Sequence, residues 1–155
     1  MQPFDHDRQI QETITRDVVT AFMALWAAQD VTETVALLTP DVVSFVYLDK
    51  SAGGMSGQKT GRDSVAEGLY GNLATWHYLQ FDWTVVGVEH NTGRAQVTFE
   101  YQHQKTDLRY AGTMRMIFVV TDGMICRVEC HHDEPRIVAF MKLVAEAEAR
   151  LLESK

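Results

Sequence analysis

The stretch "VTFEYQHQ", residues 97–104, alternates between two kinds of side chain. Val97, Phe99, Tyr101 and His103 fall at every second position, and polar residues occupy the positions between them. Successive side chains of a β-strand point to opposite faces of the sheet, so this pattern predicts a strand with one buried face. The apolar face ends in a histidine, and a polar ring inside a core needs a reason. The stretch therefore predicts a strand and a candidate site residue together.

The segments around this stretch predict three more strands. Residues 76–85 show the same two-residue period and reach residues 97–104 through the turn "HNTG" at 90–93. Residues 107–121 and 124–133 follow, joined by Asp122-Gly123, a dipeptide typical of tight hairpins. Four consecutive antiparallel strands of this length indicate a curved sheet.

The N-terminal half of the chain reads mainly as helix. Apolar residues recur at helical spacing from about residue 8 to 28, with Asp7 as the expected N-cap. Thr60 and Asp63 resemble a capping box, and Pro135 suits the first turn of a last helix. The remaining expected elements are a helix at 32–38, a strand at 41–48, a glycine-rich surface loop at 49–60, a helix at 61–73 and the C-terminal helix from 135.

This order of elements predicts an α+β fold, in which a curved antiparallel sheet packs on N-terminal helices and carries an extra C-terminal helix. We expect residues 1–155 to form one domain, because no linker or repeat divides them. The net charge of −7, from 21 acidic and 14 basic residues, argues against nucleic acid as a partner. Because the sequence shows neither a membrane-spanning run nor a signal peptide, we expect a cytoplasmic protein.

Two histidines are candidate catalytic residues. His77 shares one face of its predicted strand with Leu79, Phe81 and Trp83, and His103 follows the buried face of the next strand. An imidazole gains and loses a proton near neutral pH, so a facing pair could act as acid and base. The alternative is that both lie half-exposed at strand ends and bind backbone groups.

The segment "ECHHDE", residues 129–134, predicts no metal site, since adjacent strand residues point to opposite faces and no zinc motif is present. Which face of this strand is buried stays open. A two-residue turn at Asp122-Gly123 would set Arg115 opposite Cys130, either in a pocket or on the solvated face. Cys130 is a nucleophile only beside a base or cation, and otherwise a small core thiol.

Aromatic residues could line an apolar pocket for a small molecule, although such residues also form ordinary cores. We find no phosphate-binding or dinucleotide-binding motif and expect no cofactor. The predicted substrate-pocket residues are Phe22, Trp26, Phe45, Tyr47, Tyr70, Phe81, Tyr101, Arg115 and Cys130.

The element order, the helix opening "TGRDSVAEGL" (60–69) and the finish "TDGMICRVECHHDE" (121–134) resemble the nuclear transport factor 2-like superfamily. This cone-shaped α+β fold is shared by ketosteroid isomerases, polyketide cyclases of the SnoaL type and scytalone dehydratase. Within it, "TWHYLQFDW" (75–83) and "YQHQKTD" (101–107) are most similar to the scytalone dehydratase branch. That resemblance implies catalytic roles for His77 and His103.

The resemblance implies a cofactor-free lyase or isomerase that acts on an apolar carbonyl or polyketide-like compound, and a homodimer. The sequence departs from the family pattern at several positions; for example, the helical tyrosine of the dehydratase branch falls near Trp26, its strand asparagine has no clear match near Met114, and the carboxylate of the cyclases aligns with Cys130. A second function therefore stays open, a non-catalytic ligand-binding or dimerisation module of the same fold. A cavity smaller than about 300 Å³, or outward-pointing histidines, would favour it.

Overall fold

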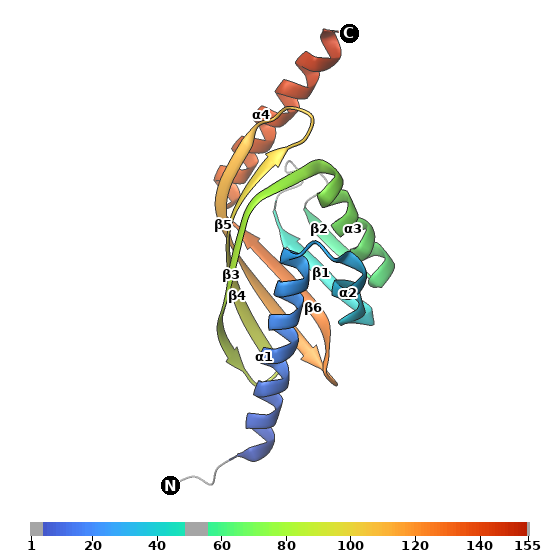
Figure 1. Ribbon diagram of the computed structural model, residues 1–155, viewed down its shortest axis with the longest axis vertical. Helices are drawn as coiled ribbons and strands as arrows, with labels where there is room; N and C mark the ends of the chain where they lie inside the picture. The colour runs from blue at the N-terminus through green and yellow to red at the C-terminus, as the bar shows by residue number, and fades with distance from the viewer. Residues whose placement is uncertain (1–4, 49–55, 155) are drawn as a thin grey trace.

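The computed structural model describes residues 5–48 and 56–154. Helices lie at both ends of the chain and a long series of strands lies between them (Figure 1), as predicted for an α+β fold. The elements in chain order are α1 (His6–Ala27), α2 (Val31–Ala36), β1 (Leu38–Tyr47), β2 (Gly57–Thr60), α3 (Arg62–Thr75), β3 (Trp76–Glu89), β4 (Thr92–His103), β5 (Arg109–Thr121), β6 (Met124–His132) and α4 (Glu134–Glu153).

The strands form one sheet in the order β2-β1-β6-β5-β4-β3. The consecutive antiparallel pairing of β3 to β6 confirms the prediction. The expectation of a wholly antiparallel sheet was wrong, because β1 pairs with β6 in parallel. This contact joins strands far apart in sequence, and no turn between them sets their relative direction. The result is a curved mixed sheet.

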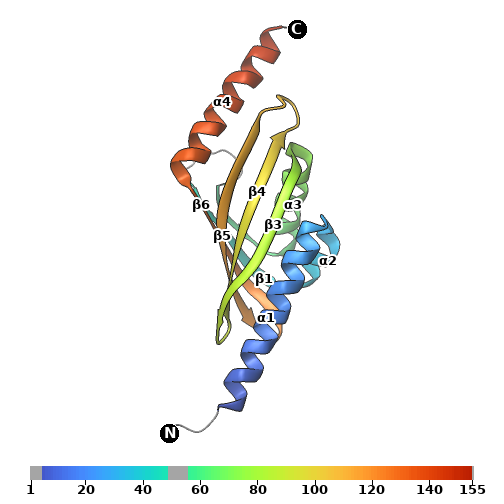
Figure 2. The ribbon, with the colours of Figure 1, turned by 60° about the vertical axis from the view of Figure 1, so that its left-hand side comes forward.

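Helix α1 lies across one face of the curved sheet in both views of the ribbon (Figures 1 and 2). Its buried stripe consists of Val19, Phe22, Met23 and Trp26, together with Thr15. Asp5, rather than Asp7, is the N-cap, and its side chain accepts a hydrogen bond from the Arg8 backbone N–H at 3.0 Å. The amphipathic pattern therefore predicts the helix well and its first residue less well.

The start of α3 differs from the prediction. Gly61 is its N-cap with φ of +91°, and no side chain of a described residue caps this end, so the predicted capping box of Thr60 and Asp63 does not form. Part of the predicted surface loop at 49–60 is strand β2, which pairs with β1. Residues 49–55 of that loop lie outside the described residues.

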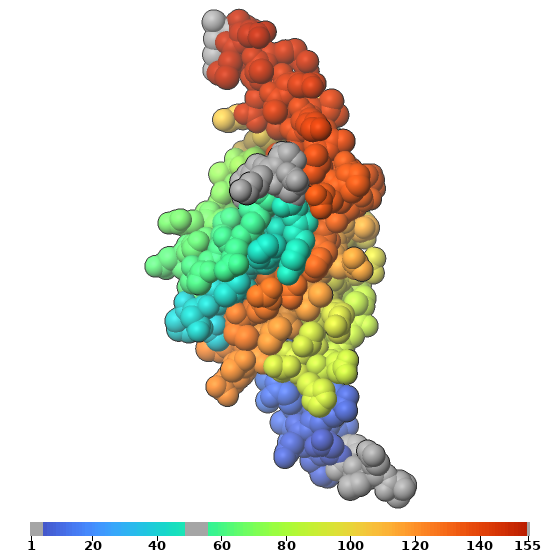
Figure 3. Space-filling model, turned by 180° about the vertical axis from the view of Figure 1, so that it is seen from behind, coloured from blue at the N-terminus to red at the C-terminus, as the bar shows by residue number. Residues whose placement is uncertain are grey.

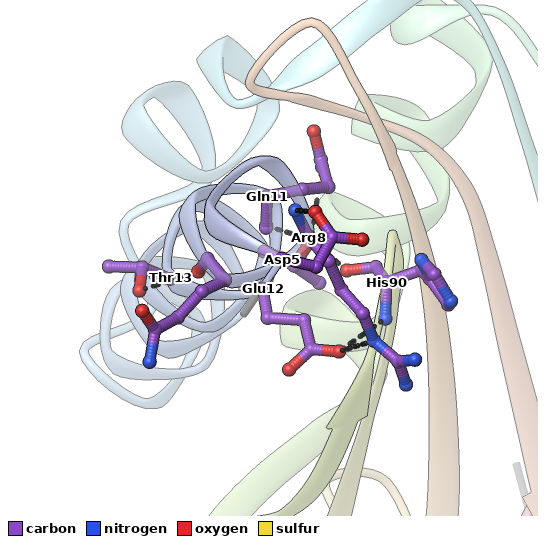
Figure 4. A network of polar contacts seen from close by, with 8 residues as sticks. Asp5, Arg8, Gln11, Glu12, Thr13 and His90 are labelled. Carbon is purple, nitrogen blue, oxygen red and sulfur yellow. Dashed lines mark hydrogen bonds and ion pairs between the residues drawn. The ribbon is translucent and has the colours of Figure 1, made fainter. Parts of the chain in front are cut away.

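The N-terminal half of α1 is fastened to the turn between β3 and β4 (Figure 4). The Glu12 carboxylate accepts hydrogen bonds from Arg8 Nε at 3.0 Å and from the His90 backbone N–H at 3.2 Å. The buried Thr15 hydroxyl lies 2.9 Å from the His90 carbonyl oxygen. A Cβ at Gly93 would lie 2.8 Å from Val19 Cγ2, so glycine permits this close contact of helix and strand.

Helix α4 packs on the sheet through its first half and then extends beyond it, as the views from the front and from behind show (Figures 1 and 3). Ile137, Phe140 and Val144 are buried, and the Phe140 ring lies 5.2 Å from the Tyr110 ring and 5.9 Å from the Trp76 ring. Leu151 and Leu152 near its end are exposed. Within residues 5–48 and 56–154, no helix is both long and apolar enough to span a bilayer.

We predict that Thr15→Val lowers the free energy of unfolding by about 1–2 kcal/mol, because it removes the buried hydroxyl that donates to the His90 carbonyl oxygen. Thr13→Val is the matched control on the same helix, since Thr13 is exposed and bonds to the Gln9 carbonyl alone. Its effect should stay within about 0.5 kcal/mol. Urea unfolding measures both, and equal effects would contradict the assigned fastening role.

Candidate functional site

Strand β3 contains an extra residue that decides which of its side chains face the helices. Tyr78 pairs with Tyr101 and Gln80 with Glu100, so Leu79 has no partner on β4 and forms a β-bulge. Before the bulge Trp76 and Tyr78 face inward, and after it Phe81 and Trp83 do. The predicted inward position of His77 was wrong, because the strict alternation behind it holds only without a bulge. His77 and Leu79 are exposed.

His103 is buried, as the alternation of β4 predicts, but it does not line the cavity between the sheet and helices α1 and α3, and instead contacts α4. Its side chain is 4 % exposed, and its ring packs edge-on against Trp76, with ring centroids 5.0 Å apart. Nδ1 lies 2.9 Å from the Thr106 hydroxyl, and Nε2 lies 3.5 Å from the Glu148 carboxylate on α4. His103 therefore joins the end of β4 to α4 and does not meet His77.

A β-bulge in β6 settles the open orientation of this strand. Val120 pairs with Ile125 but Val119 pairs with Arg127, so Cys126 is the extra residue. This shift sets Arg115 opposite His131, not opposite Cys130 as a regular hairpin would. Arg115 is exposed on the outer face of the sheet.

A cavity of about 130 Å³ lies between the inner face of the sheet and helices α1 and α3. Most of its wall is apolar, and none of the described residues that line it is acidic. Its volume lies below the roughly 300 Å³ of typical sites for drug-sized ligands. The cavity is lined by Phe22, Trp26, Ser44, Val46, Lys59, Val65, Gly68, Leu69, Asn72, Trp76, Tyr78, Tyr101, Met114, Met116, Val128, Cys130 and His132.

Four of the predicted pocket residues line this cavity, namely Phe22, Trp26, Tyr101 and Cys130. The other five do not. The Phe45 and Tyr47 rings are tilted against each other with centroids 4.3 Å apart, and Tyr47 stacks on His131, which does not line the cavity. Tyr70 is 55 % exposed on α3, Phe81 packs beside Tyr78, and Arg115 faces outward.

Sequence reasoning missed the imidazole that lines the cavity, His132. The sequence of β6 shows a two-residue alternation, but this alternation does not decide which of the two faces of the strand is buried. Val128, Cys130 and His132 line the cavity, in phase with one another, and Met114 and Met116 on β5 stand opposite His132 and Cys130. The cysteine and histidines of "ECHHDE", which form no metal motif, could have indicated that this strand contributes polar side chains to the cavity wall.

The two tyrosines of the cavity form a pair. Tyr78 on β3 and Tyr101 on β4 stack with ring centroids 4.4 Å apart, and their hydroxyl groups interact electrostatically. Burial raises the pKa of both phenols well above the ordinary value, so both keep their protons at neutral pH. Such a pair carries two hydroxyl protons, so at least one of them stays free for a ligand.

Among the described residues, none is a strong hydrogen-bond partner of His132. Its Nδ1 is buried without a partner, and Nε2 has a long contact of 3.7 Å with the Cys130 thiol. Burial, assisted by His131, lowers the pKa of His132 to about 4, so the imidazole is neutral at pH 7. Burial raises the pKa of Cys130 to about 12, which keeps the thiol protonated and makes it a poor nucleophile.

Metal binding finds no support in the described residues, where no three His, Cys, Asp or Glu side chains are grouped closely enough to hold an ion. The chemistry available in the cavity is therefore that of a neutral imidazole, two phenols and a few polar donors.

We predict that His132 makes stability depend on pH. The pKa is about 4 in the folded state and about 6.5 unfolded, so between these values the unfolded chain binds more protons. Stability is complete above pH 6.5 and falls as the pH drops toward 4. Between pH 8 and 5 the wild type should lose about 1–2 kcal/mol more than His132→Gln. Urea unfolding at both pH values measures this, with His77→Gln as the control at an exposed position.

Known structures share the fold at low sequence identity. A candidate polyketide cyclase from Silicibacter sp. TM1040 superposes with a TM-score of 0.69 and 15% identity, covering 81% of this chain and 93% of that one. A candidate isomerase from Rhodopseudomonas palustris gives 0.67 and 11%, covering 91% and 98%. A Catenulispora acidiphila protein with a ketosteroid isomerase-like fold, in complex with trimethylamine, gives 0.63 and 13%, covering 79% and 89%.

These structures confirm the predicted cone-shaped fold of the nuclear transport factor 2-like superfamily. No curated protein sequence is significantly similar to the chain. Residues 19–128, which are more than half of the chain, match the SnoaL-like domain family. The chain therefore belongs to the SnoaL-like domain family.

Proposed function

We propose that the protein binds a small, largely apolar carbonyl compound in this cavity and moves a proton at the carbon beside the carbonyl, as a cofactor-free isomerase or lyase. His132 accepts the proton, and the Tyr78–Tyr101 pair donates a hydrogen bond to the carbonyl oxygen. The observation that carries the proposal is an imidazole in an apolar cavity whose ring nitrogens find no strong hydrogen-bond partner in residues 5–48 and 56–154.

The neutral state of His132 suits this role. A buried polar group without a partner is costly, and native structures keep few of them without a functional reason. The low pKa makes His132 a weak base in the empty cavity. An enolate formed beside it would stabilise the imidazolium, because opposite charges attract strongly where water is excluded.

The tyrosine pair supplies the complementary group. Because both phenols stay protonated, the free hydroxyl of the pair can donate to an oxygen that becomes negative during the reaction. A positioned proton acceptor contributes roughly 10²–10⁴-fold to such a reaction. The names of the structural neighbours, polyketide cyclase and isomerase, agree with this class of chemistry.

A specific observation favours a second function, ligand binding without catalysis. The cavity of about 130 Å³ is small, and the described residues that line it include no carboxylate. A cavity of roughly this size accommodates a molecule of about the size of benzene. The trimethylamine held by the Catenulispora protein shows that a ligand this small can occupy a protein of the same fold.

The acid–base roles predicted for His77 and His103 remain predictions. The exposed position of His77 and the contacts of His103 with Thr106 and Glu148 give neither a place at the cavity. The assay below includes a variant of His77, so it separates the two assignments.

We predict that the protein accelerates exchange of the α-protons of cyclopentanone in D₂O, a reaction followed by proton NMR without knowledge of the natural substrate. His132→Gln should lower the protein-dependent rate by about 10²-fold or more, because the proton acceptor is lost. Tyr78→Phe and Tyr101→Phe should each reduce it as well, whereas His77→Ala should leave it unchanged.

Two outcomes decide between the functions. Binding of cyclopentanone without any protein-dependent exchange would support the binding module and contradict the isomerase or lyase. Exchange that survives in His132→Gln but disappears in His77→Ala would transfer the base role to His77.

A further inference from the structure

One charged side chain lies among the described residues that line the cavity. Lys59 extends from β2, whereas every other lining residue is apolar or uncharged, His132 included. The chain as a whole carries a net charge of −7, so a cation in this apolar wall stands out from the general surface. A charge beside an apolar cavity loses part of its hydration, and a bound group of opposite charge would compensate this loss.

Two further hydrogen-bond donors line the cavity on neighbouring elements. Ser44 on β1 is the direct cross-strand neighbour of Lys59, and both side chains face inward. Asn72 lines the cavity from α3, which packs on β1 and β2. In the described part of the chain, the Lys59 ammonium, the Ser44 hydroxyl and the Asn72 amide make no hydrogen bond or ion pair. Their donor capacity is therefore available to a ligand.

A glycine in α3 makes room for the lysine. A Cβ added at Gly68 would lie 2.7 Å from Lys59 Cε and 3.0 Å from Cδ, so any other residue would push the lysine side chain aside. Glycine is among the least favourable residues inside a helix. Gly68 lies in the middle of α3 because the Lys59 side chain passes directly over this position of the helix.

We propose that Lys59, Ser44 and Asn72 form an anion-binding subsite, and that the ligand is a small carboxylate with an apolar body. This inference rests on the proposed small-molecule site and narrows its substrate class to carbonyl compounds that also carry a carboxylate. The ammonium neutralises the single charge, and the hydroxyl and amide donate to the carboxylate oxygens. A phosphate monoester, with nearly two negative charges, would exceed what one cation balances.

The first test compares two ligands of the same shape, cyclopentanecarboxylate and cyclopentanecarboxamide. Binding is followed by the fluorescence of Trp26 and Trp76, which line the cavity. The wild type should bind the carboxylate about tenfold or more tightly than the amide, because a charge-assisted hydrogen bond is stronger than a neutral one. Lys59→Met should abolish this preference, and Lys142→Met, at an exposed position on α4, should retain it.

The second test moves the ammonium without removing it. Gly68→Ala places a methyl group against the Lys59 side chain, which is flexible enough to shift away while α3 keeps its structure. The preference for the carboxylate should fall several-fold. Gly71→Ala is the matched control on the same helix, since a Cβ there meets no atom within 4 Å, and its preference should equal that of the wild type.

The inference is overturned if the wild type binds both ligands equally, if it binds neither, or if the preference survives in Lys59→Met. These outcomes are independent of the exchange reaction of cyclopentanone, which has no carboxylate. Exchange that depends on His132 without any preference for the anion leaves the proposed function standing and removes the subsite. A preference for the carboxylate that depends on Lys59, without any exchange of cyclopentanone protons, leaves the anion-binding subsite standing and removes the proposed proton transfer.

Discussion

The alternation of side chains across the pleated sheet, reset by the β-bulges at Leu79 in β3 and at Cys126 in β6, decides which residues line the interior of this molecule. Each bulge moves the following residues to the other face of the sheet. The bulge at Leu79 keeps Trp76 and Tyr78 in phase with Phe81 on the inner face and leaves His77 outside. The bulge at Cys126 lets both Ile125 and Val128 be buried and aligns Cys130 and His132 with the cavity. The chemistry of the interior follows from these two irregularities.

Local pattern was sufficient for most of the architecture. The strict alternation of Val97, Phe99, Tyr101 and His103 matches their burial, and the Asp122-Gly123 turn forms with both residues at positive φ. Helix α1 appears where apolar residues recur at helical spacing. Each of these features depends on residues close in sequence, whose physical preferences agree with the fold.

Contacts between residues far apart in sequence could not be predicted from local pattern. The parallel pairing of β1 with β6 brings together residues about 80 positions apart, and no local preference encodes it. A bulge likewise leaves little trace in sequence, because an extra leucine or cysteine suits either face of a strand. The surroundings of the cavity depend on both features. Phe22 and Tyr101, which lie on regular segments, line the cavity, whereas His77 and Arg115, which lie on bulged strands or opposite one, are exposed.

Trp76 contributes both to the cavity wall and to the contact between the sheet and α4. Its indole forms part of the cavity wall, and the same ring packs against Phe140 of α4 and against His103, which in turn reaches Glu148. By thermodynamic linkage, any effect of a guest on the packing of α4 through this ring is matched by an equal effect of α4 on the affinity for the guest. The interior and the projecting C-terminal helix thus share one side chain, and a change at either is felt first at Trp76.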